Sequence, residues 1–185
     1  MKMFGVTSAC VLALLVAGGC SSSSKTTTPS TVAPSATSTP RTLAYGVVPI
    51  SVTACSLATP DQVNALVGAK PTGVESDSSE VYKTCTWSSG SGVLAVGVIR
   101  LGGGQLGFYG KKVGLTAVDV PGFGDKATYS TGKNSNGRNE ALLVANRGTA
   151  SVSVDASYAG TNAPPASAED SLKSIAAGVF TQMGA

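Results

Sequence analysis

The first 42 residues of this 185-residue chain do not have the composition of a folded domain. An apolar stretch from Phe4 to Val16 follows the basic residue Lys2, and it is too short to span a bilayer, which requires about 20 apolar residues. We interpret residues 1–19 as a cleavable export signal. The segment from Ser21 to Thr42 is nearly all Ser, Thr, Pro and Ala, and it cannot bury enough apolar surface to offset the entropy of ordering. The fold must therefore come from the rest of the chain, which we expect to begin at Val47.

Cys20 lies between the small residues Ala17, Gly18 and Gly19 and a run of serines. This arrangement resembles the lipobox of bacterial lipoproteins, although that pattern favours Leu, Val or Ile where this chain has Ala17. The resemblance implies that the Cys20 thiol is lipidated and that residues 20–46 form a disordered tether. It places the protein at the extracytoplasmic face of the cell membrane, anchored through its acyl chains. The alternative is an ordinary secretory signal, with Cys20 an incidental thiol.

Export also limits which cysteines can pair. Cys10 leaves with the signal and Cys20 carries lipid, so Cys55 and Cys85 remain. Disulfides persist in oxidising compartments, and we therefore expect a structural Cys55–Cys85 bridge. Closing a loop of about 31 residues restricts the unfolded state by roughly 3.7 kcal/mol in the chain-entropy treatment. A redox role is the alternative, but it favours a Cys-x-x-Cys spacing that this pair lacks.

The charges are nearly balanced, with 13 Lys and Arg against 10 Asp and Glu, and the chain has no histidine. The basic residues are spread rather than clustered, so we expect no nucleic-acid partner. Without an imidazole base, Ser or Cys hydrolysis of the common kind and most zinc sites are excluded. We therefore predict no catalytic residue, no metal and no cofactor.

Local patterns predict the first elements of the folded part. Thr59, Pro60 and Gln62 indicate the start of a short helix, because they fit the N-cap, the first helical position and the capping box. Residues 81–87 and 93–100 are rich in β-branched side chains and flank a Ser-Gly-Ser-Gly loop, which predicts a hairpin. Strand alternation places Cys85 and Trp87 on the core face. Lys83 falls on the same face, and it fits there only if it sits at a sheet edge or if its ammonium reaches water.

The second half predicts more strands and a helix. Residues 127–130, 141–145 and 150–154 have strand character and are joined by turn sequences. Apolar residues from Leu172 to Met183 recur at the spacing of one helical face, with Ser167 as N-cap. We expect one α+β domain over residues 47–185. It would be an antiparallel meander sheet of about five or more strands, with a short N-terminal helix and an amphipathic C-terminal helix packed on one face.

Three short motifs follow one another in the folded part: Cys55-Ser56-Leu57, then Cys85-Thr86-Trp87, then Gly122-Phe123-Gly124-Asp125-Lys126-Ala127. Their order resembles a family of cell-envelope lipoproteins of mycobacteria and related actinobacteria. That family repeats Cys-Ser-Leu-Leu, Cys-x-Trp and Gly-Leu-Gly-Asp-x-Ala behind a lipobox and a tether. Ala58 and Phe123 replace two of its leucines. The resemblance implies no reaction. The arrangement is also distantly similar to extracytoplasmic sensor domains of actinobacterial receptor kinases, which implies a ligand cleft.

Several polar groups are candidates for chemistry. We interpret Glu75, Asp77 and Glu80 as solvated charges in a polar loop that lacks the spacing of a calcium loop. Gly102-Gly103-Gly104 with Lys111 and Lys112 lacks the Gly-Lys-Ser/Thr step of a phosphate loop and is interpreted as a connection between strands.

The turn that holds Phe123 and Asp125 has two interpretations. Either Phe123 fills the core beside a tight bend, or both residues lie at the rim of a ligand cleft together with Trp87.

The sequence therefore predicts a membrane-anchored, non-catalytic binding or sensor module of the cell envelope. Its ligand would be a small apolar molecule, a glycan or another envelope protein. The alternatives are a structural accessory of a membrane complex and a histidine-independent hydrolase of wall or lipid components. A pair of buried carboxylates in a groove would favour the hydrolase, and a flat apolar patch would favour a protein partner.

Overall fold

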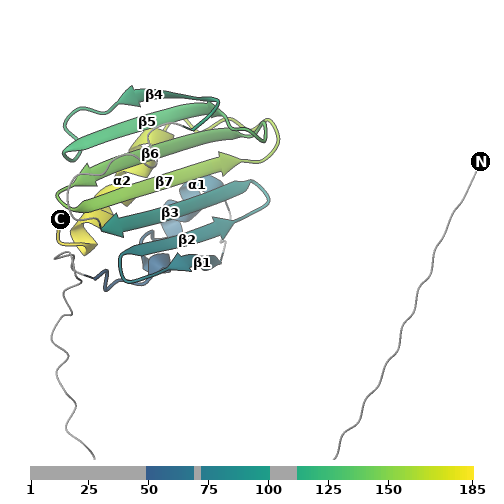
Figure 1. Ribbon diagram of the computed structural model, residues 1–185. Coiled ribbons are helices and arrows are strands. Elements are labelled where there is room, and N and C mark those ends of the chain that lie inside the picture. The colour runs from purple at the N-terminus through teal and green to yellow at the C-terminus, as the bar shows by residue number, and fades with distance from the viewer. Residues whose placement is uncertain (1–48, 69–71, 101–111) are drawn as a thin grey trace, which may run out of the picture. The chain divides into compact units, whose positions relative to one another are not determined.

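The computed structural model describes residues 49–68, 72–100 and 112–185. The predicted signal, Cys20, the tether, the expected domain start at Val47, the Gly102-Gly103-Gly104 run and Lys111 lie outside the described residues. Within these ranges the chain forms an α+β domain, as expected (Figure 1). Its elements are η1 (Ala54–Ser56), α1 (Pro60–Val67), β1 (Gly73–Ser78), β2 (Tyr82–Ser88), β3 (Gly92–Arg100), β4 (Leu115–Asp119), β5 (Lys126–Lys133), β6 (Asn139–Arg147), β7 (Ala150–Tyr158) and α2 (Ala168–Gln182).

The seven strands form one open antiparallel sheet in the order β1-β2-β3-β7-β6-β5-β4. It consists of two meanders, β1 to β3 and β4 to β7. They are joined where β7, the last strand of the second meander, pairs with β3, the last strand of the first. The pairing of β3 with β7 runs over their whole length, from Gly92 opposite Tyr158 to Arg100 opposite Ala150. The two edges of the sheet are therefore β1 and β4.

Both helices cover one face of the sheet, where α2 packs on β6 and β7 and α1 packs on β3, β7 and α2 (Figure 1). The register aligns Leu143, Val154 and Val96 across the three central strands, so their side chains share this inner face. All three are fully buried. The core lies between this face and the apolar stripe of α2, whose largest buried side chain is Phe180.

The two predicted helix starts are confirmed, and one of them has the full predicted cap. The Thr59 hydroxyl accepts from the Gln62 amide, and the Thr59 amide donates to the Gln62 side chain, which completes the capping box. Gly68 ends α1 at a φ of 75°, which favours glycine. Ser167 precedes α2 as predicted, but its side chain makes no capping bond.

Two arginines from the sheet hold the C-terminal end of α2. The Arg100 guanidinium donates to the Met183 carbonyl, and the Arg147 guanidinium lies 4.9 Å from the centre of the Phe180 ring. Cations at a helix C-terminus interact favourably with the exposed carbonyls and the dipole. These contacts join the ends of β3 and β6 to the same turn of the helix.

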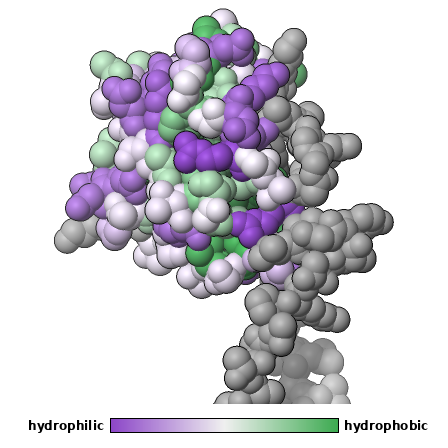
Figure 2. Space-filling model, turned by 90° about the vertical axis from the view of Figure 1, so that its left-hand side faces the viewer, coloured by the Kyte–Doolittle hydropathy of each residue, from purple (hydrophilic) through white to green (hydrophobic). Residues whose placement is uncertain are grey.

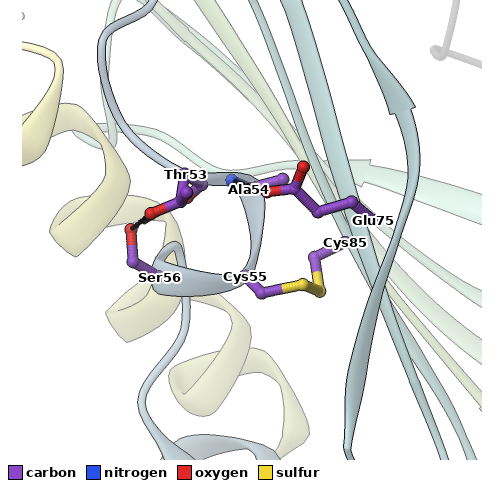
Figure 3. Close-up of a disulfide and its surroundings, with 6 residues drawn as sticks. All are labelled: Thr53, Ala54, Cys55, Ser56, Glu75 and Cys85. Atoms are coloured by element: carbon purple, nitrogen blue, oxygen red, sulfur yellow. Dashed lines mark hydrogen bonds between the residues drawn. A yellow bond between two sulfur atoms is a disulfide. The ribbon is translucent and has the colours of Figure 1, made fainter. Parts of the chain in front are cut away.

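The prediction that Glu75, Asp77 and Glu80 occupy a loop is wrong for the first two, because both lie in β1. β1 is an edge strand with a bulge between Glu75 and Asp77, so its exposed polar residues hide the alternation that marks a strand. The Glu75 carboxylate accepts from the Ala54 amide at 2.8 Å and so fastens η1 to the sheet (Figure 3). Lys83 is not at a sheet edge, because β2 pairs with β1 on one side and β3 on the other. Its side chain is partly exposed instead, and its ammonium donates to the Ser78 hydroxyl.

Candidate functional site

A pocket of about 270 Å³ opens between α1 and the sheet, beside the disulfide. One wall is Trp87 of β2, and the other is the start of α1 with the residues just before it. The full lining is Cys55, Ala58, Pro60, Asp61, Val63, Asn64 and Trp87. The pocket thus joins three features that the sequence indicated separately: the helix start, the cysteine pair and the tryptophan.

The predicted disulfide is present and forms the floor of this region. Cys55 of η1 and Cys85 of β2 are bonded, with their Cα atoms 5.0 Å apart (Figure 3). Cys85 is fully buried, whereas Cys55 is partly exposed and lines the pocket. The bridge therefore fixes the distance between η1, from which α1 follows, and the strand that carries Trp87.

Trp87 takes its position because its neighbour on β1 has no side chain. Gly73 lies opposite Trp87 in the register, and a Cβ at that position would be 2.5 Å from the indole nitrogen and 2.8 Å from the Cys85 sulfur. The indole can therefore lie against the backbone of β1, next to the disulfide. Trp87 is 5% exposed and presents only a small part of its ring to the pocket.

The rim of the pocket is polar while its interior is apolar. Asp61 and Asn64 are exposed and lie three residues apart, which places them on the same side of α1. Ala58 and Val63 are buried and supply apolar surface below them. Apolar walls with a few polar groups at the mouth are the usual composition of a small-molecule site. The pocket can therefore hold a small ligand that has an apolar part and at least one hydrogen-bonding group.

The structure does not bring the three predicted cleft residues together. Phe123 and Asp125 line a separate hollow of about 280 Å³, formed by the loop between β4 and β5. This loop leads directly into β5, and β5 is four strand positions from β2 in the sheet. At about 4.8 Å per strand, the loop is roughly 19 Å from Trp87.

Within the loop, each of the two residues has a structural contact. Phe123 packs near Phe180 with ring centres 6.3 Å apart, as its interpretation as a core residue implies. Asp125 accepts from the Gly148 amide at 2.6 Å and so joins the loop to the β6–β7 turn.

A second polar cluster lies on the sheet face opposite the helices and was not predicted. The Lys112 ammonium is 2.9 Å from the Glu140 carboxylate and also contacts the carboxylate of Asp155. Asn134 donates to the second Glu140 oxygen. Burial, and the nearby Glu140 charge, raise the pKa of Asp155, although Lys112 acts in the opposite direction. Both carboxylates are thus engaged by one lysine, which is the arrangement of a structural ion-pair network.

Two further features of the described residues concern metal ligands and membrane-spanning helices. Across residues 49–68, 72–100 and 112–185, no three His, Cys, Asp or Glu side chains lie close enough together to hold a metal ion. Within the same ranges, none of the helices has the length and apolar character needed to cross a bilayer.

Comparisons with known proteins add no assignment. A scan against protein-family models gives no match, and neither curated proteins nor solved structures give one.

Replacing Gly73 by alanine is expected to displace Trp87 or the disulfide, because the new methyl group overlaps both. We expect the free energy of unfolding to fall by about 1 to 3 kcal/mol, the usual cost of overpacking. Urea unfolding measures this change, and the emission of the only tryptophan reports the displaced ring. Gly90→Ala is the matched control, because a Cβ there meets nothing within 4 Å. Equal stability of the two variants would contradict the close packing of Gly73.

Proposed function

We propose that this protein is a lipid-anchored binding module of the bacterial cell envelope, without catalytic activity, and that its ligand occupies the Trp87 pocket. The observation that carries the proposal is the pocket itself, which combines a tryptophan, apolar walls and a polar rim at one covalently fixed position. The N-terminal sequence supplies the other half, since the export signal, Cys20 and the polar tether would hold the domain within tens of ångströms of the membrane.

The composition of the pocket favours a small neutral ligand over a protein partner. Its volume of about 270 Å³ is just below the range of about 300 to 1,000 Å³ that is usual for small-molecule sites, so only a small ligand fits. On the molecular face drawn in Figure 2, apolar patches alternate with hydrophilic side chains, and among the described residues visible there neither kind forms a broad continuous surface. A glycan unit or a small partly apolar metabolite of the envelope fits these features better than a flat protein interface.

Anchoring is tested by replacing Cys20 with alanine in a bacterium that processes lipoproteins. We expect the variant to move from the membrane fraction to the soluble extracytoplasmic fraction, because two acyl chains supply the stable attachment. Intact-mass analysis of the membrane-extracted parent should show a processed chain that begins at an acylated Cys20. An unmodified Cys20 in that fraction would contradict the anchoring half of the proposal.

Ligand binding is tested by native mass spectrometry of the full chain purified from its own membrane. We expect a retained small molecule that is lost in Asn64→Phe, which narrows the pocket mouth from an exposed position on α1. Ala65→Phe is the matched control, because Ala65 is exposed on the same helix but does not line the pocket. Retention by both variants, or no bound species in the parent, would contradict the binding half.

A further inference from the structure

Within residues 49–68, 72–100 and 112–185, the edge strand β4 lacks the protection that the opposite edge has. β1 carries a bulge, acidic residues and a hydrogen bond to η1, all of which discourage the addition of another strand. β4 lies at the other end of the sheet (Figure 1), and its only charged residue is Asp119 at its last position. It pairs with β5 through all five residues without a register shift. One side of β4 is therefore a regular, straight edge.

Apolar side chains are exposed along this edge. Val118 within β4 is 54% exposed, and Val113 just before it is 85% exposed. They are two of the three large apolar side chains that are exposed among the described residues, and the third, Val74, lies on β1. Exposed apolar residues on an unprotected edge mark a site where another strand can add.

The hydrogen-bond pattern shows which backbone groups face outward. The Val120 amide donates to the Ala127 carbonyl of the neighbouring chain segment at 3.0 Å. Because bonding alternates along an antiparallel strand, Val118 and Thr116 also bond inward to β5. Ala117 and Asp119 therefore direct their N–H and C=O groups away from the sheet. The Leu115 carbonyl also faces outward, whereas its amide donates to the Lys112 carbonyl.

We propose that β4 pairs antiparallel with β4 of a second copy of this chain, in the register that places Ala117 opposite Ala117. In this register the two Ala117 residues exchange backbone hydrogen bonds, and each Asp119 amide donates to the Leu115 carbonyl of the other copy. Val118 lies beside Thr116 of the second copy, and both side chains are exposed. Each outward donor of Ala117 and Asp119 thus gains an acceptor.

Charge selects this register over its neighbours. Asp119 is opposite Leu115 here, so the two carboxylates are at the far ends of the paired strands. Sliding one strand by two residues places the two Asp119 side chains on a diagonal, and sliding it by four places them directly opposite each other, which is unfavourable. The register that pairs all of β4 is therefore also one that keeps the two Asp119 carboxylates well apart.

The test uses the full chain in the membrane of an exporting host, with single cysteines introduced at the two edges. Facing residues of such a pair have Cα atoms about 5.5 Å apart, which is within the range of a disulfide. We expect Ala117→Cys to give a covalent dimer on non-reducing electrophoresis, and Val74→Cys, at the exposed β1 edge, to give no more than the parent chain. Equal cross-linking of the two variants, or an Ala117→Cys adduct with a different protein and no dimer, would overturn the proposal.

A second variant separates loss of pairing from loss of folding. Ala117→Pro removes an outward N–H and leaves the hydrogen bonds to β5 intact. We expect its dimer dissociation constant, measured by analytical ultracentrifugation of the full chain in detergent, to rise at least about tenfold, while the melting temperature stays within about 2 °C of the parent. A parent chain that remains monomeric at a concentration of about 100 µM, which corresponds to very weak association, overturns the proposal.

Discussion

A chain with both Cys55 and Cys85 replaced by alanine is expected to lose about 3 to 4 kcal/mol of its free energy of unfolding. The two residues are 30 apart in sequence, and removing the bridge frees the loop in the unfolded state. The loss is large because small exported domains typically have only about 5 to 15 kcal/mol in total. Urea unfolding followed by Trp87 emission measures it, since the indole lies next to the bonded sulfurs.

Chemical reduction supplies the control for this variant. A thiol reductant should lower the stability of the parent chain to a value near that of the double variant, and should leave the double variant unchanged. Cys55 lines an open pocket, so the reductant reaches the bridge without global unfolding. If the parent and the double variant unfold at the same urea concentration, the bridge does not stabilise the fold.

Replacing Lys112 by methionine is expected to cost about 3 kcal/mol at neutral pH. The Glu140 side chain is 3% exposed, and without Lys112 it remains a buried charge with Asn134 as its remaining described partner. Breaking a buried ion pair by removing one member typically costs about 3 to 5 kcal/mol, and the lower end applies because the Lys112 side chain is 42% exposed. Lys173→Met is the matched control, since its pair with Glu169 is a partly exposed i, i+4 helical pair, a kind worth about 0.5 kcal/mol.

The Lys112 contribution should also depend on pH. Burial alone lowers the pKa of Lys112, but its bonds to Asp155 and Glu140 and their charges raise the pKa above the usual 10.5. The charged form is therefore favoured in the folded state, so the stabilisation is complete below pH 10.5 and is lost as the pH rises through the higher folded value. Burial also raises the pKa of Tyr158 to about 12, so its contribution to stability is likewise lost at high pH. This loss is the same in the parent and in Lys112→Met and cancels in their difference.

The measurement is the difference in unfolding free energy between the parent and Lys112→Met, determined by urea unfolding from neutral pH to about pH 11. The difference should stay constant to about pH 10 and then shrink. A Lys112→Met variant that costs no more than Lys173→Met would show that the network does not stabilise the sheet.

The elements that the sequence predicted correctly are those whose signals are local. The capping residues of α1, the stripe of α2 and the alternation of β2 and β3 each lie within one segment, and all are confirmed. The two missed strands, β1 and β4, are the edges of the sheet. Because an edge strand buries little on either face, its residues need not alternate. Gly73–Ser78 has only one apolar side chain, Val74, and in Leu115–Asp119 the alternation is broken by the neighbouring Ala117 and Val118.

The site was predictable only in part, for the same reason. The proximity of Cys55 and Cys85 followed from counting cysteines, and Trp87 followed from alternation, but no local pattern indicates that Asp61 and Asn64 face them across a pocket. The i, i+3 spacing of Asp61 and Asn64 predicts only that they share one side of α1, and it does not predict what that side faces. The Lys112, Glu140 and Asp155 network comes from a loop and two strands, and it depends on pairing between β6 and β7 that no short segment specifies.

The position of the disulfide determines how the domain carries mechanical load. Cys55 lies in η1, the first element of the described part of the chain. A pull on the N-terminal side therefore passes through the sulfur atoms into β2, which is paired on both sides within the sheet. α1 and β1 lie inside the covalent loop between the two cysteines and are bypassed by the force. A protein held to a surface through its N-terminal end would keep its pocket intact under tension, and it would lose this resistance when the bridge is reduced.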